Sequence, residues 1–198
     1  MVAKAQKSLW KSAWKLLLEG QNSPKLPYGT PVVSTVSATG IPYSRVMVLR
    51  GASKVEGELL CYTDRRSLKV SHLKQGGGFM AWTFWSPTQQ LQFSCSGPTT
   101  ELPERVCRKT FLDLPKHSRK AYAALSRPGT RLTEPSDGLP DDWTDRPMNQ
   151  TDYAEVNFLV LKTKITRAEI LQLNREGNRR LLVERNVQEN WDFQWLVP

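Results

Sequence analysis

Cationic and hydroxyl side chains gather in two short stretches of the chain, at positions 45–50 and 62–69. The first stretch begins with Arg45 and ends with Arg50, and the second combines several hydroxyl groups with Lys69. We expect Asp64 to be the N-cap of a short helix, which leaves Ser67 and the N–H groups of the first helical turn to face an anion. These residue types and spacings predict a site that holds a phosphate group.

The overall composition favours one domain with an anionic partner. The 198 residues are 39% hydrophobic, which is enough for one sizeable core, so we treat residues 1–198 as a single domain. The formal net charge of +9 fits a phosphorylated small molecule, a nucleic acid or an acidic membrane surface. Charge alone does not choose among these partners.

The cysteine, histidine and hydropathy patterns argue against several other classes of protein. The 3 cysteines include no Cys-x-x-Cys pair, which argues against a disulfide framework and favours a reducing compartment. His72 and His117 have no cysteine or carboxylate at ligand spacing, so we expect no metal site. No apolar run approaches the roughly 20 residues that cross a bilayer. We therefore expect a soluble, cytoplasmic protein without a membrane partner.

The N-terminal stretch 7–20 is predicted as an amphipathic helix that ends at Gly20. Apolar residues follow one face and lysines follow another: Trp10, Ala13, Trp14, Leu17 and Leu18 on the first, and Lys4, Lys7, Lys11 and Lys15 on the second. The basic character is compatible with an organellar targeting segment or a membrane-surface helix. The tryptophan pair favours the other interpretation, a first helix packed on the domain.

The pattern beyond position 30 predicts a mainly β protein with helices (α+β). Strands are expected at 30–37, through 45–49, and at 57–63, 78–86, 89–97, 153–162, 165–173 and 180–185. Helices are expected at 66–74 and within 103–125, and a surface loop is expected at 126–150. We infer an antiparallel barrel decorated by helices, with its core at about 30–100 and 153–198 and a helical and loop insertion at about 103–150.

Several of these motifs together resemble the pyridoxamine 5′-phosphate oxidase family. The resemblance is carried by Gly40-Ile41-Pro42-Tyr43-Ser44-Arg45, Tyr62-Thr63, Ser67-x-Lys69, Gln92 five residues before Gly97, and a C-terminus of the form Trp-x4-Leu-x-Pro. Within this family the chain is most similar to the branch described as pyridoxamine phosphate oxidase-related.

The resemblance implies a fold, a cofactor and an assembly. The fold would be a split β-barrel that binds FMN noncovalently at a homodimer interface, with two sites that are each lined by both subunits. The implied activity is oxidation of pyridoxamine or pyridoxine 5′-phosphate to pyridoxal 5′-phosphate with O₂. The implied cofactor-binding residues are Arg45, Val46, Met47, Val48, Leu49, Arg50, Tyr62, Thr63, Ser67, Leu68, Lys69 and Gln92.

On the cofactor side the chain departs from the family at two cations. Arg50 stands where the family usually has lysine, so a planar guanidinium replaces a point charge. Leu68 stands where the better-known oxidases have a second phosphate-binding arginine. The resemblance then leaves Arg45 and Lys69 as the cations that bind the FMN phosphate.

On the substrate side the departures are larger. Thr110 and Leu114 stand where the oxidases have the tyrosine and arginine that bind the substrate phosphate, and only Ser118 is retained there. The resemblance therefore implies Arg50, Ser118 and Arg179 as substrate-binding residues. Lys116 and Arg119 are alternative cations for the missing arginine. No side chain is required as a base if the substrate proton leaves to water, so no catalytic residue is assigned.

Two other functions fit parts of the sequence. An FMN-binding protein or reductase of the same fold, without vitamin B6 oxidase activity, would explain a retained flavin site beside an altered substrate helix. A nucleic-acid binder would use the net charge together with Trp82, Phe84 and Trp85 as a stacking surface. We expect no nucleic-acid partner, because aromatic residues in strands usually fill cores and no RNA-binding motif is present.

Overall fold

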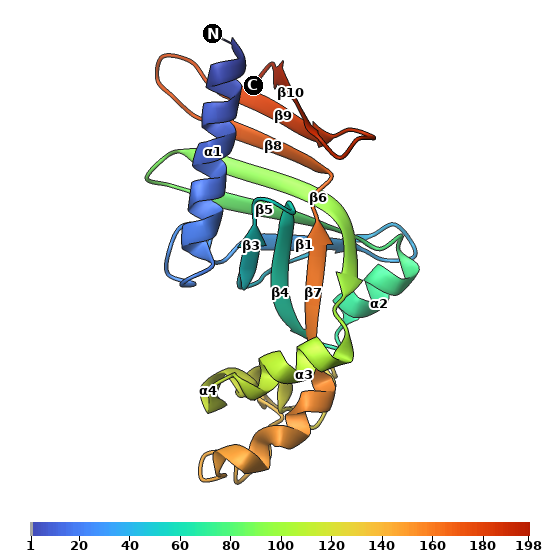
Figure 1. The fold of residues 1–198 in the computed structure, drawn as a ribbon. Helices are drawn as coiled ribbons and strands as arrows, with labels where there is room; N and C mark the ends of the chain where they lie inside the picture. The colour runs from blue at the N-terminus through green and yellow to red at the C-terminus, as the bar shows by residue number, and fades with distance from the viewer. Residues whose placement is uncertain (1) are drawn as a thin grey trace.

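The structure, a computed structural model, describes residues 2–198 and consists of an antiparallel sheet with helices at its side and at one end (Figure 1). The strands are β1 (Val32–Val36), β2 (Pro42–Val46), β3 (Gly51–Ser53), β4 (Glu58–Asp64), β5 (Phe79–Ser86), β6 (Leu91–Glu101), β7 (Phe158–Lys164), β8 (Arg167–Gln172), β9 (Arg179–Arg185) and β10 (Trp191–Leu196). The helices are α1 (Val2–Gly20), α2 (Leu68–Gln75), α3 (Glu104–Leu112) and α4 (Lys116–Arg119), with 3₁₀ segments η1 (Lys120–Tyr122) and η2 (Met148–Asn157).

Strand β6 joins the two halves of the sheet. Along the first path the order is β10-β9-β8-β6-β5-β1-β2, while β3, β4 and β7 form a second path that returns to β6. The last residues of β6 pair with β7 rather than β8. Gly97 lies at this crossing, and a Cβ atom there would stand 1.8 Å from the Lys164 carbonyl oxygen. Only glycine therefore allows β6 to pass this close to β7.

Alternation of side chains along β5 and β6 separates a core face from an outer face. Trp82, Phe84, Phe93 and Cys95 are buried on the core face, whereas Trp85 is exposed on the outer face. Of the three aromatic residues considered for a stacking surface, Trp82 and Phe84 thus fill the core and are not available to stack on bases. All three cysteines are buried free thiols.

Helix α1 packs along the core face of the sheet, and its N-terminus lies close to the C-terminus of the chain (Figure 1). The Trp10 ring lies 5.1 Å from the ring of Trp191 and 6.0 Å from that of Phe93. The predicted apolar face was partly wrong, because Leu18 is exposed and Leu16 is buried. Among residues 2–198, no helix has the length and apolar character needed to cross a membrane.

The helix at the second basic stretch begins later than predicted. The N-cap of α2 is Ser67 and not Asp64. The Asp64 carboxylate accepts a hydrogen bond from the backbone N–H of Arg66 at 2.7 Å and pairs with the guanidinium of the same residue. Asp64 therefore stabilises the turn that precedes the helix.

Two strand boundaries also differ from the expectation. The strand expected at 153–162 begins at Phe158, because the 3₁₀ segment η2 occupies the preceding residues. The C-terminal residues 191–196 were not predicted as a strand but form β10, whose alternating aromatic residues pair with β9. This last strand supplies part of the surface that covers α1.

Candidate functional site

The two basic stretches meet at one cavity of about 340 Å³. Arg45 comes from β2 and Lys69 from the first turn of α2, which follows β4. The Lys69 ammonium donates hydrogen bonds to the hydroxyl oxygens of Thr63 at 2.9 Å and Ser67 at 3.0 Å. The Arg45 guanidinium donates to the Thr35 hydroxyl oxygen at 3.0 Å and to the Val33 carbonyl at 3.2 Å. Cations, hydroxyl groups and a helix N-terminus therefore converge at one end of the cavity.

The electrostatics of this end favour an anion. Burial lowers the pKa of Lys69, and the nearby charge of Arg45 lowers it further. Burial also lowers the pKa of Arg45. Among the described residues, no carboxylate forms an ion pair with either cation, since the adjacent Asp64 is held by Arg66. Two neighbouring cations without an acidic partner fit a phosphate, which would relieve their mutual repulsion.

The rest of the cavity has an aromatic wall. The Tyr62 ring packs at 5.1 Å from Phe158, and Tyr122 from η1 completes the wall. The Arg50 guanidinium lies 5.4 Å from the centre of the Tyr62 ring. Burial raises the pKa values of both tyrosines, so their hydroxyl groups stay neutral. A cationic end next to an aromatic wall fits a ligand with a phosphate and a flat ring, as FMN has.

Most of the predicted cofactor residues line this cavity. They are Arg45, Val46, Met47, Val48, Arg50, Tyr62, Thr63, Ser67 and Lys69. Leu49 does not line it, because its side chain is 1% exposed and packs in the core. The Leu68 side chain is 57% exposed outside the cavity. Ala121, Tyr122 and Pro128 were missed, and no local pattern could have found them because they come from the distant insertion.

Gln92 and Arg179 lie away from this cavity, on opposite faces of the sheet. Gln92 pairs with Leu171 across β6 and β8, on the outer face, and donates a hydrogen bond to the Ser94 hydroxyl at 3.1 Å. Arg179 pairs with Gln172, which is one residue further along β8 than Leu171, the partner of Gln92. The Arg179 guanidinium donates to the Gln172 side-chain oxygen at 2.7 Å. Because side chains alternate along a strand, Arg179 and Gln172 face α1 instead.

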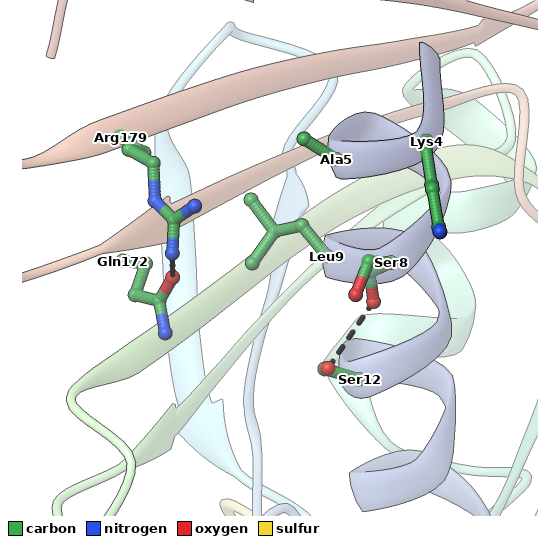
Figure 2. A pocket seen from close by; sticks show the side chains of 7 residues that line it. All are labelled: Lys4, Ala5, Ser8, Leu9, Ser12, Gln172 and Arg179. Carbon is green, nitrogen blue, oxygen red and sulfur yellow. Dashed lines mark hydrogen bonds between the residues drawn. The ribbon is translucent and has the colours of Figure 1, made fainter. Parts of the chain in front are cut away.

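Figure 2 shows Arg179 and Gln172 on one side of a groove of about 520 Å³, with Leu9 and Ser8 of α1 on the other side. Arg180, the next residue, is the arginine on the face of Gln92, since it pairs with Leu171. Its guanidinium is held by Glu169 at 2.9 Å. In this register Arg179 and Gln92 cannot contact the same ligand from one chain.

The substrate-side residues lie in the helical insertion. Ser118 is half-buried in α4. The Thr110 hydroxyl donates to the Val106 carbonyl at 2.8 Å, and Leu114 packs against the core. The Lys116 ammonium donates to the Thr144 carbonyl at 2.8 Å and lies over the Trp143 ring.

Arg119 is a structural residue of the same insertion. Its side chain is 2% exposed, and its guanidinium donates to the Asp152 carboxylate at 2.5 Å and to the carbonyls of Leu112 and Leu114 at 2.9 and 3.1 Å. Both alternative cations therefore have partners within the chain. Arg50 therefore remains as the cation beside the aromatic wall of the cavity.

Comparison with known proteins identifies the segment that carries most of the cavity. Residues 7–102 match the family model described as "Pyridoxamine 5'-phosphate oxidase, FMN-binding domain". These residues are an FMN-binding domain of the pyridoxamine 5′-phosphate oxidase family. The nine predicted residues that line the cavity all lie within this domain, as does Gln92. The expected family and cofactor are thereby confirmed.

Individual relatives agree with this assignment. The chain is 30% identical over 96 residues to a pyridoxine/pyridoxamine 5′-phosphate oxidase of Blochmanniella pennsylvanica (strain BPEN). That match spans 48% of this chain and 43% of the relative, which is less than half of the relative's length.

Two solved structures share the fold over nearly the whole chain. A pyridoxamine 5′-phosphate oxidase-related, FMN-binding protein of Nostoc punctiforme PCC 73102 has a TM-score of 0.72 at 22% identity and covers 96% of this chain and 97% of its own. PhzG of Burkholderia lata 383 has a TM-score of 0.66 at 15% identity, with 86% and 82% covered. The expected FMN-binding split barrel is confirmed by these likenesses, which concern the fold alone.

Proposed function

We propose that the chain is an FMN-dependent oxidoreductase that oxidises pyridoxamine or pyridoxine 5′-phosphate to pyridoxal 5′-phosphate with O₂. The observation that carries this proposal is the pair Arg45 and Lys69, two cations without an acidic partner among the described residues, at the end of a cavity with an aromatic wall. When bound, FMN supplies hydride acceptance and reaction with O₂. The protein supplies position, charge and exclusion of water.

The residues of the cavity have distinct proposed roles. Arg45, Lys69 and Ser67 hold the FMN phosphate, and Tyr62 and Thr63 lie along the rest of the cofactor. Arg50 is the proposed contact for the phosphate of the substrate, because it lies at the cavity next to Tyr62 and forms no ion pair among the described residues. A planar guanidinium binds a phosphate through two parallel hydrogen bonds.

We further propose that two chains form a homodimer with two sites, each built from the cavity of one chain and the outer sheet face of the other. Support comes from Gln92, which lies on the outer face away from the cavity of its own chain. The same face exposes apolar side chains: Val32, Val36, Phe79 and Trp85. A monomeric protein seldom exposes so many apolar residues on one face. On this arrangement Arg180, rather than Arg179, shares the face of Gln92 and would orient the substrate.

The insertion favours a second candidate function. The insertion offers no uncommitted cation for a substrate phosphate at these positions. Lys116 and Arg119 already have partners within the chain, and Thr110 and Leu114 carry no charge. An FMN-dependent reductase or oxidase for a substrate without a phosphate would need none. PhzG, which has the same fold, was solved with tetrahydrophenazine-1-carboxylic acid, a carboxylic acid.

An anaerobic titration distinguishes the two functions. The FMN-loaded protein is mixed with pyridoxamine 5′-phosphate without O₂, and the flavin absorbance at about 450 nm is followed. Bleaching that returns on admitting air supports B6 oxidase activity. The same titration with pyridoxamine, and with Arg50→Ala, should bleach much more slowly if Arg50 binds the phosphate. A flavin band that stays unchanged at every substrate concentration would contradict the oxidase and favour the second candidate.

A further inference from the structure

A buried hydrogen-bonded chain runs from the phosphate end of the cavity to His72. The Arg45 guanidinium donates to the Thr35 hydroxyl oxygen at 3.0 Å, and that oxygen lies 3.1 Å from His72 Nδ1. Thr35 and His72 are both buried, and the imidazole packs against the Tyr43 ring at 4.7 Å between centres. His72 belongs to α2, the helix that also carries Lys69. The chain thus links β2 to α2 through β1.

The direction of these hydrogen bonds follows from the chemistry of the groups. A guanidinium only donates, so the Thr35 oxygen must accept from Arg45. The hydroxyl hydrogen of Thr35 then needs an acceptor, and His72 Nδ1 is the acceptor that lies within reach among the described residues. An imidazole that accepts at Nδ1 is neutral and carries its hydrogen at Nε2.

We propose that His72 is a positioning residue for the phosphate of FMN. By accepting the Thr35 hydrogen, it fixes the orientation of the Thr35 oxygen and holds the Arg45 guanidinium at the cavity, opposite Lys69 of its own helix. His72 does not contact the ligand. The inference rests on the proposed role of Arg45 in binding the FMN phosphate.

The experiment compares FMN with riboflavin, which lacks the phosphate, by quenching of flavin fluorescence. His72→Leu removes the acceptor, and loss of one such hydrogen bond should weaken FMN binding about tenfold. Riboflavin affinity should not change, because riboflavin has no group for Arg45 to bind. His72→Asn places an amide oxygen near the position of Nδ1 and should restore most of the FMN affinity. Thr35→Val and Thr35→Ser give the same contrast one step along the chain.

Each other outcome has a definite meaning. In an Arg45→Ala background, His72→Leu should cause no further loss of FMN affinity, because the residue through which it acts is gone. Equal weakening of FMN and riboflavin by His72→Leu, or no weakening of either, would overturn the positioning role. If the unsubstituted protein itself binds FMN no more tightly than riboflavin, the phosphate site is wrong and the proposed function fails with it.

Discussion

Lys69 is buried beside a second cation, Arg45, and a bound phosphate would stabilise its charge more than the ligand-free protein does. Its pKa is lowered by burial and by Arg45. Lys69→Met should therefore weaken FMN binding about 10- to 100-fold, as loss of a charge-assisted hydrogen bond does, and should leave riboflavin binding unchanged. The FMN-free variant should also unfold at a higher temperature. Lys74→Met is the matched control, because Lys74 lies on the same helix and pairs with Glu101.

The same lowered pKa predicts a pH dependence. Between the pKa of Lys69 in the folded protein and its ordinary value of 10.5, the unfolded chain binds a proton that the folded chain has lost. The free energy of unfolding of the FMN-free protein should therefore rise with pH in this alkaline window, relative to Lys69→Met. Urea unfolding of both proteins across the window measures this difference. A difference that stays constant with pH would contradict the assignment.

Residues close together in sequence could be placed at the cavity from sequence, and distant ones could not. Arg45 and Lys69 are separated in the chain only by β3, β4 and their connections, and each belongs to a motif that is visible in the sequence. Tyr122 reaches the cavity only because the insertion folds back across β4. The faces of Gln92 and Arg179 depend on strand register, and a shift of one residue reverses the face.

The helical insertion is stabilised by one buried guanidinium. Arg119 satisfies two backbone carbonyls and pairs with Asp152 on η2. Arg119→Met should lower the free energy of unfolding by about 2–3 kcal/mol, because it leaves these acceptors without a donor. Arg108→Met removes an exposed arginine of the same insertion and should change stability little. Urea unfolding with a parallel FMN titration makes the measurement. An Arg119→Met protein of normal stability that no longer oxidises its substrate would instead indicate a substrate role.

Local sequence signals found most elements but misplaced some boundaries. Asp64 is a good N-cap residue, yet its carboxylate pairs with Arg66, and the N-cap is Ser67, three residues later. Strand β10 shows the alternation of a strand, Trp191-x-Phe193-x-Trp195, and so could have been predicted. The burial of Arg119 could not, because its carboxylate partner lies 33 residues further along the chain.

The outer face of the sheet tests the assembly. Phe79 is 54% exposed and Trp85 is 43% exposed on this face. If it is the dimer interface, Trp85→Glu should place a charge in an apolar contact and convert the dimer to a monomer. Val55→Glu alters an exposed residue in the turn between β3 and β4 and should leave the dimer intact. Analytical ultracentrifugation gives the masses, and a dimer that survives Trp85→Glu would place the interface elsewhere.

A site shared between chains can be tested by mixing two defective variants. The first variant combines Lys69→Met with Arg45→Ala and damages the cavity. The second, Gln92→Trp, blocks the outer face of the sheet. Each variant alone should retain little FMN while remaining a dimer. A mixed dimer has one site with both halves intact and one with both halves damaged. Random pairing makes about half of the dimers mixed, so about a quarter of all sites should regain FMN. Refolding the two variants together and measuring bound FMN per chain gives this fraction. Mixed dimers that recover no FMN would show that a single chain builds the whole site.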